Sequence, residues 1–421
     1  MRRPQGLRSK GWLLLLVGVA LLVGLTLVNY RYAQQNPGGN DFLVHWVGTR
    51  LFLTEGVSPY SDQTALEIQT MVYGRAARPG EHELRVAYPL YSIVVFFPFA
   101  LIADFNWARA AWMTVLEVSL VLLSYFSIRL VRWRPGALIL GAYFLFSVTW
   151  YHAVRPLILG NAVILVALGL VAALLAIRNQ LDELAGVLLA LTTIKPQVVV
   201  LVLAVVLLWC LAQKRWKVVF WFVGTLLLLM GVAFLLLPDW ILQNLAEILR
   251  YPGYNPPGTP GAALASFWPG VGKRLGYGLT LVLSLFLLVE WWLGRRLPFR
   301  MFLWTVSLTL TISQWIGIQT DPGNFIVLMP ALTLVLAGIQ GRWKRSSTFW
   351  ILITLLVVGV GLWVLFIATL EHGYQPVQSP VMFFPLPAFL LVMLYWVRWW
   401  AMRPPSAWVD EIAEAGIGWR R

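Results

Sequence analysis

The chain has 421 residues, of which 59% are hydrophobic and only 12% are charged. Soluble domains carry roughly a quarter charged residues, so this composition excludes a soluble globular protein and indicates a polytopic membrane protein. The net charge of +14 would also suit a nucleic-acid-binding protein. However, many Lys and Arg residues lie in short clusters beside apolar runs, which is typical of cytoplasmic loops and excludes that class. The single cysteine, Cys210, can form neither a disulfide framework nor a thiolate metal site.

About 12 apolar runs follow one another along the chain, and a membrane span needs roughly 20 such residues. They cover approximately residues 12–30, 88–103, 107–130, 137–153, 156–177, 183–212, 217–237, 279–294, 300–317, 323–340, 347–370 and 381–400. Lipid offers no partner to unpaired backbone groups, and the alternation of a barrel is not visible. We therefore predict an all-α polytopic membrane protein, with one domain over residues 1–421 and about 12 transmembrane helices.

The first run is too long for the apolar region of a secretory signal and lacks a small-x-small cleavage site, so we expect a retained anchor. With the N-terminus inside, twelve crossings return the basic tail, 401–421, to the cytoplasm. The same map places Arg129, Arg132 and Arg134 outside, against the charge rule. We therefore expect some piece between 88 and 212 to be re-entrant or half-crossing. The 183–212 run is broken by Lys195-Pro196 and forms either one long crossing or two short pieces.

Four polar segments share the outer face on this map. They are residues 31–87, 238–278, 318–322 and 371–380. The spacing of apolar residues in the first segment predicts short helices lying on the membrane. The 238–278 segment begins with an amphipathic piece and becomes rich in Pro and Gly, which indicates an ordered or gating loop. Loops of such length are usually functional or disordered.

The most informative stretch, DFLVHWVGTRLFLTEGVSPY at 41–60, directly follows the first apolar run. It resembles the first outer loop of glycosyltransferase family 87, whose members are polyprenyl-phosphate-sugar-dependent enzymes of the GT-C superfamily. The matching residues are Asp41, His45, Arg50, Gly56, Pro59 and Tyr60, followed by Tyr88-Pro89, Gly160-Asn161 and AGVLLALTTIKP ending at Lys195-Pro196. The resemblance covers the first half of the chain better than the second. Where family members often carry Ser-x-x-His-type residues in a late outer turn, this chain has Gln-Thr-Asp-Pro-Gly-Asn at 319–324.

The resemblance implies a GT-C fold and a site on the extracytoplasmic face of the plasma (inner) membrane. It implies transfer of one sugar, most commonly mannose, from a polyprenyl phosphate to a glycan or glycolipid hydroxyl, with inversion. Such a reaction needs a general base for the acceptor hydroxyl and cations or hydrogen-bond donors for the departing phosphate. No nucleotide diphosphate takes part, so we expect no metal and no cofactor.

Asp41 is the candidate general base by this resemblance; the structural alternative is an Asp that caps a short helix. Lys195 is the candidate contact for the lipid phosphate, because an ionisable group inside an apolar run is costly. Its alternative is a lysine that reaches back to the membrane surface. Glu117 is expected to pair with Arg109, His152 or Arg155 within the bundle rather than to relay protons.

The remaining candidates form the predicted substrate-binding set. They are His45, Arg50, Tyr60, Tyr88, Asp321 and Asn324. An interfacial histidine explains His45 equally well, and Asp-Pro-Gly at 321–323 is also an ordinary turn signal. Arg129, Arg132 and Arg134 could bind phosphate only if they lie outside.

Three other functions stay open. A transporter or flippase of lipid-linked glycans needs charged residues along a path through several spans, and only Glu117 and Lys195 are so placed. An assembly protein would bind a partner through the 238–278 loop. A GT-C enzyme with a protein or a lipid A-like acceptor is the nearest enzymatic alternative.

Overall fold

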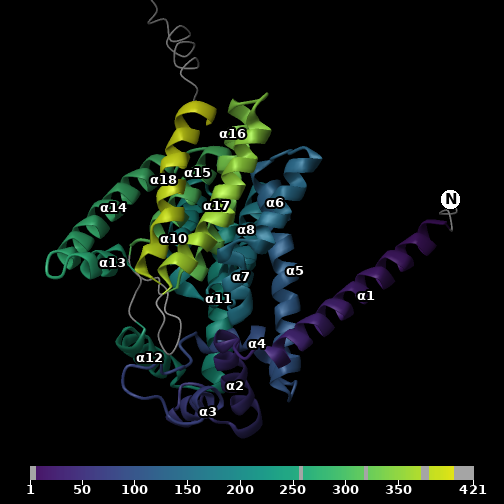
Figure 1. Cartoon of the computed structure of the whole chain (residues 1–421), viewed down its shortest axis with the longest axis vertical. Helices are drawn as coiled ribbons and strands as arrows, with labels where there is room; N and C mark the ends of the chain where they lie inside the picture. The colour runs from purple at the N-terminus through teal and green to yellow at the C-terminus, as the bar shows by residue number, and fades with distance from the viewer. Residues whose placement is uncertain (1–5, 256–258, 317–320, 371–378, 403–421) are drawn as a thin grey trace, which may run out of the picture.

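The computed structural model describes residues 6–255, 259–316, 321–370 and 379–402, and these are arranged as helices without any strand (Figure 1). Seven helical segments are long and apolar enough to cross a membrane, or eight if a bent pair counts as one span. The all-helical membrane architecture is therefore confirmed. The count of about 12 spans stays a prediction, because several apolar helices are shorter than a full span.

Most helices that qualify as spans lie along one direction of the bundle, whereas α1 and α14 lean away from it on opposite sides (Figure 1). They are α1 (Gly6–Gln35), α5 (Phe105–Val131), α11 (Trp216–Leu236), α14 (Gly272–Gly294), η2 (Pro322–Leu328) with α16 (Met329–Arg342), α17 (Ser347–Thr369), and η3 (Pro380–Phe383) with α18 (Pro385–Trp396) and η4 (Val397–Met402). The bent pair is α6 (Ala137–Thr149) with α7 (Tyr151–Leu159). The span formed by η2 and α16 is the most enclosed, with 89% of its apolar window buried, whereas α1 buries 6%. The former is a central helix, and the apolar side chains of the latter are largely exposed.

Shorter helices fill the space between these spans or cover one end of the bundle. They are α2 (Asn40–Glu55), α3 (Asp62–Tyr73), η1 (Leu90–Ser92), α4 (Ile93–Ala100), α8 (Val163–Arg178), α9 (Asp182–Thr192), α10 (Pro196–Ala212), α12 (Trp240–Tyr254), α13 (Pro260–Phe267) and α15 (Phe299–Ser313). In Figure 1, α2, α3, α4 and α12 gather at the lower end. We call it the Asp41 end and the opposite one the basic end.

The run at 88–103 does not form the full span that its composition predicts. Its helical part, η1 and α4, would be about 16 Å long, half the thickness of the hydrocarbon core. It packs against α2, where the Trp46 indole N–H donates to Phe99 O at 3.1 Å and to Ile102 O at 3.2 Å. The chain therefore enters α5 at the Asp41 end.

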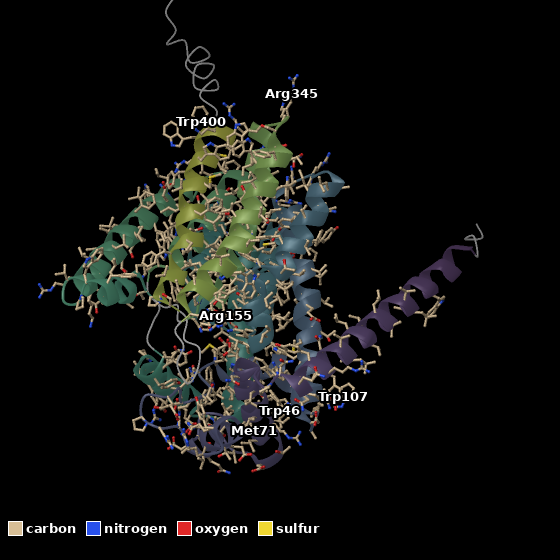
Figure 2. The ribbon with its side chains drawn as sticks, in the orientation of Figure 1. Trp46, Met71, Trp107, Arg155, Arg345 and Trp400 are labelled. Atoms are coloured by element: carbon tan, nitrogen blue, oxygen red, sulfur yellow. The ribbon has the colours of Figure 1, made fainter. Side chains whose placement is uncertain are left out.

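This shift moves the arginines that follow α5 to the other side of the bundle. Arg178, at the end of α8, donates to Leu130 O at 3.0 Å, and Gln340, at the end of α16, donates to Arg134 O at 3.1 Å. The twelve-span map, which puts Arg129, Arg132 and Arg134 opposite the later basic clusters, is therefore wrong at this point. The short η1–α4 piece agrees with the half-crossing expected between 88 and 212. Figure 2 shows Arg345 and Trp400 at this basic end, far from Trp46 and Met71.

The 183–212 run consists of two short pieces, as one of the two alternatives predicted. Asp182, which begins α9, pairs with Arg215, which follows α10, and Glu183 pairs with Lys217 at 2.9 Å. Both ends of the run therefore lie together at the basic end. The two helices form a hairpin, and its tip carries Lys195 toward the Asp41 end. The run at 156–177 is also divided, because α7 ends at Gly160 before α8 begins.

The first polar segment and α12 contact one another, as expected for segments that share a face. Arg85 Nε lies 2.7 Å from Glu247 Oε2, and both side chains are buried. Asn244 Nδ2 donates to Ala87 O and Tyr88 O, each at 3.1 Å. These bonds hold α12 over the segment that leads into η1. Parts of the predicted outer segments and the tail lie outside the described residues. They are residues 256–258, 317–320, 371–378 and 403–421.

Candidate functional site

A glycine turn fixes the start of α2 and so the position of Asp41. Gly39 has a φ of 78°, and a Cβ at this residue would lie 2.6 Å from Arg109 Nε. Arg109 is buried and donates to Asn36 O at 2.7 Å, which fixes the chain just before the turn. The N-cap of α2 is Gly39, so the interpretation of Asp41 as the capping residue is wrong. Its carboxylate lies in the first helical turn, where the helix dipole favours negative charge.

The Asp41 carboxylate contacts a buried amide from a distant part of the chain. Asn161 Nδ2 donates to Asp41 Oδ2 at 2.7 Å. Asn161 follows Gly160, which ends α7 in the left-handed conformation, and precedes α8. The break between these helices therefore delivers a polar side chain to the first turn of α2.

The same amide binds Lys195 from the tip of the α9–α10 hairpin. Lys195 Nζ donates to Asn161 Oδ1 at 2.7 Å and to Asn324 Oδ1 at 2.7 Å. Only 4% of Lys195 is exposed, so the interpretation of a lysine that reaches back to the surface is wrong. The ammonium is held inside the protein, 5.7 Å from the centre of the Tyr88 ring.

Asp321 and Asn324 come from the turn that precedes α16. Asp321 caps η2 by accepting from the Gly323 N–H, and Arg155 of α7 binds its carboxylate with two nitrogens, Nη2 to Oδ2 at 2.8 Å and Nε to Oδ1 at 3.0 Å. His152 Nδ1 lies 2.7 Å from Pro322 O. The Asp-Pro-Gly sequence does form a turn, and that turn is part of the polar cluster. Gln319 and Thr320 lie outside the described residues.

The cluster contains two carboxylates and two cations, and they are not equivalent. Burial raises the pKa of Asp41 above its ordinary value, although Lys195 and the Asn161 amide oppose that shift. Burial acts in the same direction on Asp321, but Arg155 and the Gly323 N–H bring the pKa of Asp321 below its ordinary value. A carboxylate with a raised pKa is the better proton acceptor, so Asp41 is suited to act as a base and Asp321 to stay ionised.

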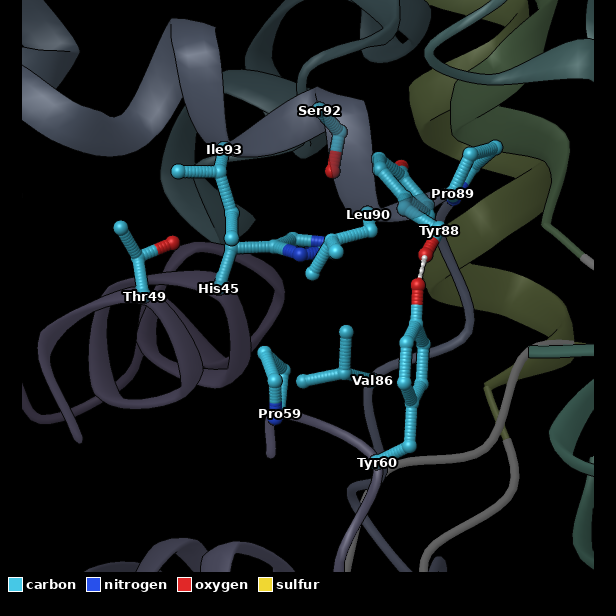
Figure 3. Close-up of a pocket in the computed structure, with 10 residues that line it drawn as sticks. All are labelled: His45, Thr49, Pro59, Tyr60, Val86, Tyr88, Pro89, Leu90, Ser92 and Ile93. Atoms are coloured by element: carbon cyan, nitrogen blue, oxygen red, sulfur yellow. Dashed lines mark hydrogen bonds between the residues drawn. The ribbon is translucent and has the colours of Figure 1, made fainter. Parts of the chain in front are cut away.

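A small pocket lies beside the cluster, along the face of α2 (Figure 3). It has room for about one water molecule, 10 Å³, and His45, Tyr60 and Tyr88 are among its lining residues. The Tyr60 hydroxyl donates to Tyr88 O at 2.8 Å, the bond drawn in Figure 3. The rings of His45 and Tyr88 are 4.0 Å apart, and burial lowers the pKa of His45 to about 3. His45 is therefore a neutral ring at physiological pH.

Arg50 is the predicted site residue that the structure does not bring to this cluster. It lies nine residues after Asp41 on α2, about 13 Å along the helix axis. Its Nη1 donates to Ala100 O at 3.0 Å, at the end of α4. Glu117 also lies apart from the cluster. It accepts a hydrogen bond from the neutral amide of Asn29 (Nδ2) at 2.8 Å, and not from Arg109, His152 or Arg155 as expected.

The model of glycosyltransferase family 87 matches residues 87–313, which is more than half of the chain. The chain belongs to glycosyltransferase family 87. This family 87 protein is therefore a glycosyltransferase that uses a sugar donor and an acceptor. The matched range includes Arg155, Asn161 and Lys195, whereas Asp41 and Asp321 lie outside it. Neither a curated protein nor a solved structure matches the chain.

Two residues of the cluster in this family 87 enzyme were not among the predicted site residues. Asn161 was noticed only as part of the Gly160-Asn161 pair, and its position directly after a helix-ending glycine was the available signal. Arg155 was only one of three expected partners for Glu117, with Arg109 and His152, because sequence alone does not show that α7 ends beside the turn at 321–324. Asn161 lies in the break between α7 and α8, and Arg155 lies within α7; in the sequence this break is hidden inside one continuous apolar run, 156–177.

Proposed function

We propose that this enzyme transfers one sugar, mannose, from a polyprenyl phosphate to an acceptor hydroxyl of a glycan or glycolipid. The observation that carries the proposal is that a partly buried carboxylate, Asp41, and a buried ammonium, Lys195, bind the two ends of one amide. Sugar transfer from a phosphate needs both groups: a base for the nucleophile and a cation for the leaving group.

In the proposed step, the acceptor oxygen attacks the anomeric carbon of the donor while Asp41 takes the hydroxyl proton. The bond from the anomeric carbon to the phosphate oxygen breaks, and its electron pair leaves with the polyprenyl phosphate. The new glycosidic bond forms on the opposite face, so the anomeric configuration inverts. The proton on Asp41 then passes to water, which restores the base.

Lys195 is the proposed contact for the leaving phosphate. An ammonium has three N–H donors, and Asn161 and Asn324 together accept two of them. The remaining N–H can bind a phosphate oxygen without loss of either amide contact. Tyr88, His45 and Tyr60 line the adjoining pocket, which must widen beyond its 10 Å³ to admit a sugar, and we assign them to the sugar and the start of the lipid chain.

The Asp321–Arg155 pair is the proposed boundary on the acceptor side. Arg155 keeps this second carboxylate ionised, so it can accept hydrogen bonds from sugar hydroxyls without competing for the catalytic proton. Asn324, predicted to line the same side, instead accepts from Lys195. Arg50, whose side chain binds Ala100 O, takes no part in the transfer step in this proposal.

The charge distribution supports an extracytoplasmic site. Because Arg129, Arg178 and Arg215 gather at the end opposite Asp41, the positive-inside rule assigns that end to the cytoplasm. The cluster then faces the outer side of the plasma membrane, where polyprenyl-linked sugars are presented, and both termini are cytoplasmic. The GT-C fold is part of the same proposal.

We propose metal-independent transfer, since a single phosphate ester leaves rather than a nucleotide diphosphate. Within the described part of the chain, there is no group of three or more His, Cys, Asp or Glu residues that could hold a metal ion. The two cations of the cluster supply the positive charge that a metal would otherwise provide.

The test is a donor panel with purified enzyme in detergent. Polyprenyl phosphates that carry mannose, glucose or arabinose are each incubated with a glycolipid acceptor, and the anomeric configuration of the product is read by NMR. The expected result is transfer from the mannosyl donor with inversion. Retention of configuration, or movement of labelled lipid across liposomes without a new glycosidic bond, would overturn the proposal.

A further inference from the structure

The amide of Asn161 has only one possible orientation in this site. The backbone N–H of Val163 donates to Asn161 Oδ1 at 2.9 Å, and Lys195 Nζ donates to the same oxygen. Both neighbours are donors, so this atom must be the carbonyl oxygen. The amide NH2 therefore faces Asp41. The opposite orientation, with the amide oxygen and nitrogen exchanged, would set the NH2 group against two other donors.

Asp41 and Lys195 have opposite charges, yet no direct ion pair within 4 Å joins these two described side chains. Each of them instead contacts a different end of Asn161. Asn161 is itself only 5% exposed, so solvent does not compete for its hydrogen bonds. A direct contact between buried opposite charges is the arrangement expected if the amide were absent.

The separation matters for an inverting displacement. The nucleophile and the leaving group lie on opposite faces of the anomeric carbon, so the base and the phosphate-binding cation must point to different places. A direct pair would hold both at one place and would stabilise the ionised carboxylate, which makes it a weaker base. An amide between them keeps both charges in the site. The carboxylate can then contact the acceptor hydroxyl while the ammonium contacts the leaving phosphate.

We propose that Asn161 is a positioning residue that holds Asp41 and Lys195 apart and aims them at the acceptor hydroxyl and at the leaving phosphate. This inference rests on the proposed function. Asn324 holds Lys195 from its other side through its own carbonyl oxygen. It therefore offers a matched comparison: Asn324 meets the same ammonium, while Asn161 meets both charged groups.

Two substitutions of Asn161 have opposite expected effects on the pKa of Asp41. Asn161→Asp keeps the shape and the oxygen that faces Lys195, but sets a carboxylate against Asp41. Two carboxylates in hydrogen-bond contact share a proton, so the pKa of Asp41 rises by at least about one unit. Asn161→Ser still accepts the Val163 N–H but cannot reach both charged groups. Lys195 then pairs with Asp41, and the pKa of that carboxyl falls.

The measurement is a pH titration of the protonated carboxyl band by infrared difference spectroscopy, with Asp41→Asn as the reference that assigns the band. Asn324→Asp is the matched control, and its expected shift of the Asp41 band is smaller than that of Asn161→Asp. Shifts in opposite directions for the two Asn161 variants support the inference. If one variant does not fold, the other alone decides by the direction of its shift.

Kinetics supply the second readout. The acid limb of the kcat/KM profile is expected to follow the spectroscopic shift, about tenfold lower activity per unit on its acid side for Asn161→Asp. Asn324→Asp is expected to raise the donor KM instead. An Asp41 band that does not move in either Asn161 variant would overturn the inference, even if activity falls. A wild-type enzyme that transfers no sugar would refute the proposed function. The infrared titration would still test the role of Asn161 in that case.

Discussion

Replacement of Gly160 by alanine tests how the break between α7 and α8 supports the site. Gly160 has a φ of 70°, and an added Cβ would lie 2.5 Å from Phe42 Cβ and 3.3 Å from Trp112 Cδ1. The left-handed conformation costs a non-glycine residue about 1–2 kcal/mol, and overpacking costs about 1–3 kcal/mol more. We expect Gly160→Ala to lower the free energy of unfolding by roughly 2–5 kcal/mol.

The same substitution should reduce turnover beyond its effect on stability. Phe42 adjoins Asp41 and Gly160 adjoins Asn161, so the added methyl group acts on both sides of the Asp41–Asn161 hydrogen bond. A displacement of about 1 Å between catalytic groups can cost about 100-fold in rate. Turnover is measured well below the unfolding temperature, which is followed by tryptophan fluorescence in detergent.

Gly74 provides the matched control. It ends α3 with a φ of 69°, and nothing lies within 4 Å of a Cβ built there. Gly74→Ala therefore carries only the conformational cost, about 1–2 kcal/mol, with turnover unchanged. Equal unfolding temperatures and equal turnover for the two variants would refute the reasoning about Gly160.

Three further outcomes are expected. Transfer should fall as the pH is lowered, because burial raises the pKa of Asp41 and only the ionised carboxylate accepts a proton. The midpoint is expected above about 3.9, the ordinary pKa of aspartate. A kcat/KM profile that stays flat through that pH would contradict this. Lys195→Met should raise the donor KM by about tenfold or more, as expected for loss of a charged hydrogen bond, while the acceptor KM stays nearly constant. Equal changes in the two KM values would contradict the assignment of Lys195 to the donor phosphate. Dialysis against EDTA should leave turnover intact, and a loss that added Mg²⁺ or Mn²⁺ restores would reveal a metal requirement.

The sequence predicted the helical class and the shared face of the two polar segments, because both follow from hydrophobicity and charge placement. The clash between the arginines and the charge rule predicted that some piece between 88 and 212 does not cross fully, but it did not identify 88–103 as that piece. An apolar run has the same composition whether it spans the membrane or packs on α2, and only the bonds from Trp46 and Arg50 to the end of α4 distinguish the two. Counting 88–103 as a full crossing is what places Arg129, Arg132 and Arg134 on the wrong side of the twelve-span map.

The site was predicted in part. Asp41 could be named through the resemblance of the 41–60 stretch to family 87, and Lys195 because an ionisable group inside an apolar run is costly. Asn161 could not, since a neutral amide after a glycine is an ordinary helix boundary until its two neighbours are known. Arg155 lies 166 residues from its partner Asp321, and such a long-range pair leaves no local pattern. The contacts in the cluster depend on how α2, α7, the hairpin tip and η2 converge.

The most direct measurement of the central claim is the transfer rate of Asp41→Asn at saturating donor and acceptor. Asparagine keeps the shape of the side chain and an oxygen that can accept from Asn161, so the unfolding temperature should stay within a few degrees of the wild-type value. Loss of a general base costs about 100- to 10,000-fold in rate, and the account predicts a loss of that size. A folded Asp41→Asn enzyme that turns over at a near-normal rate would contradict it.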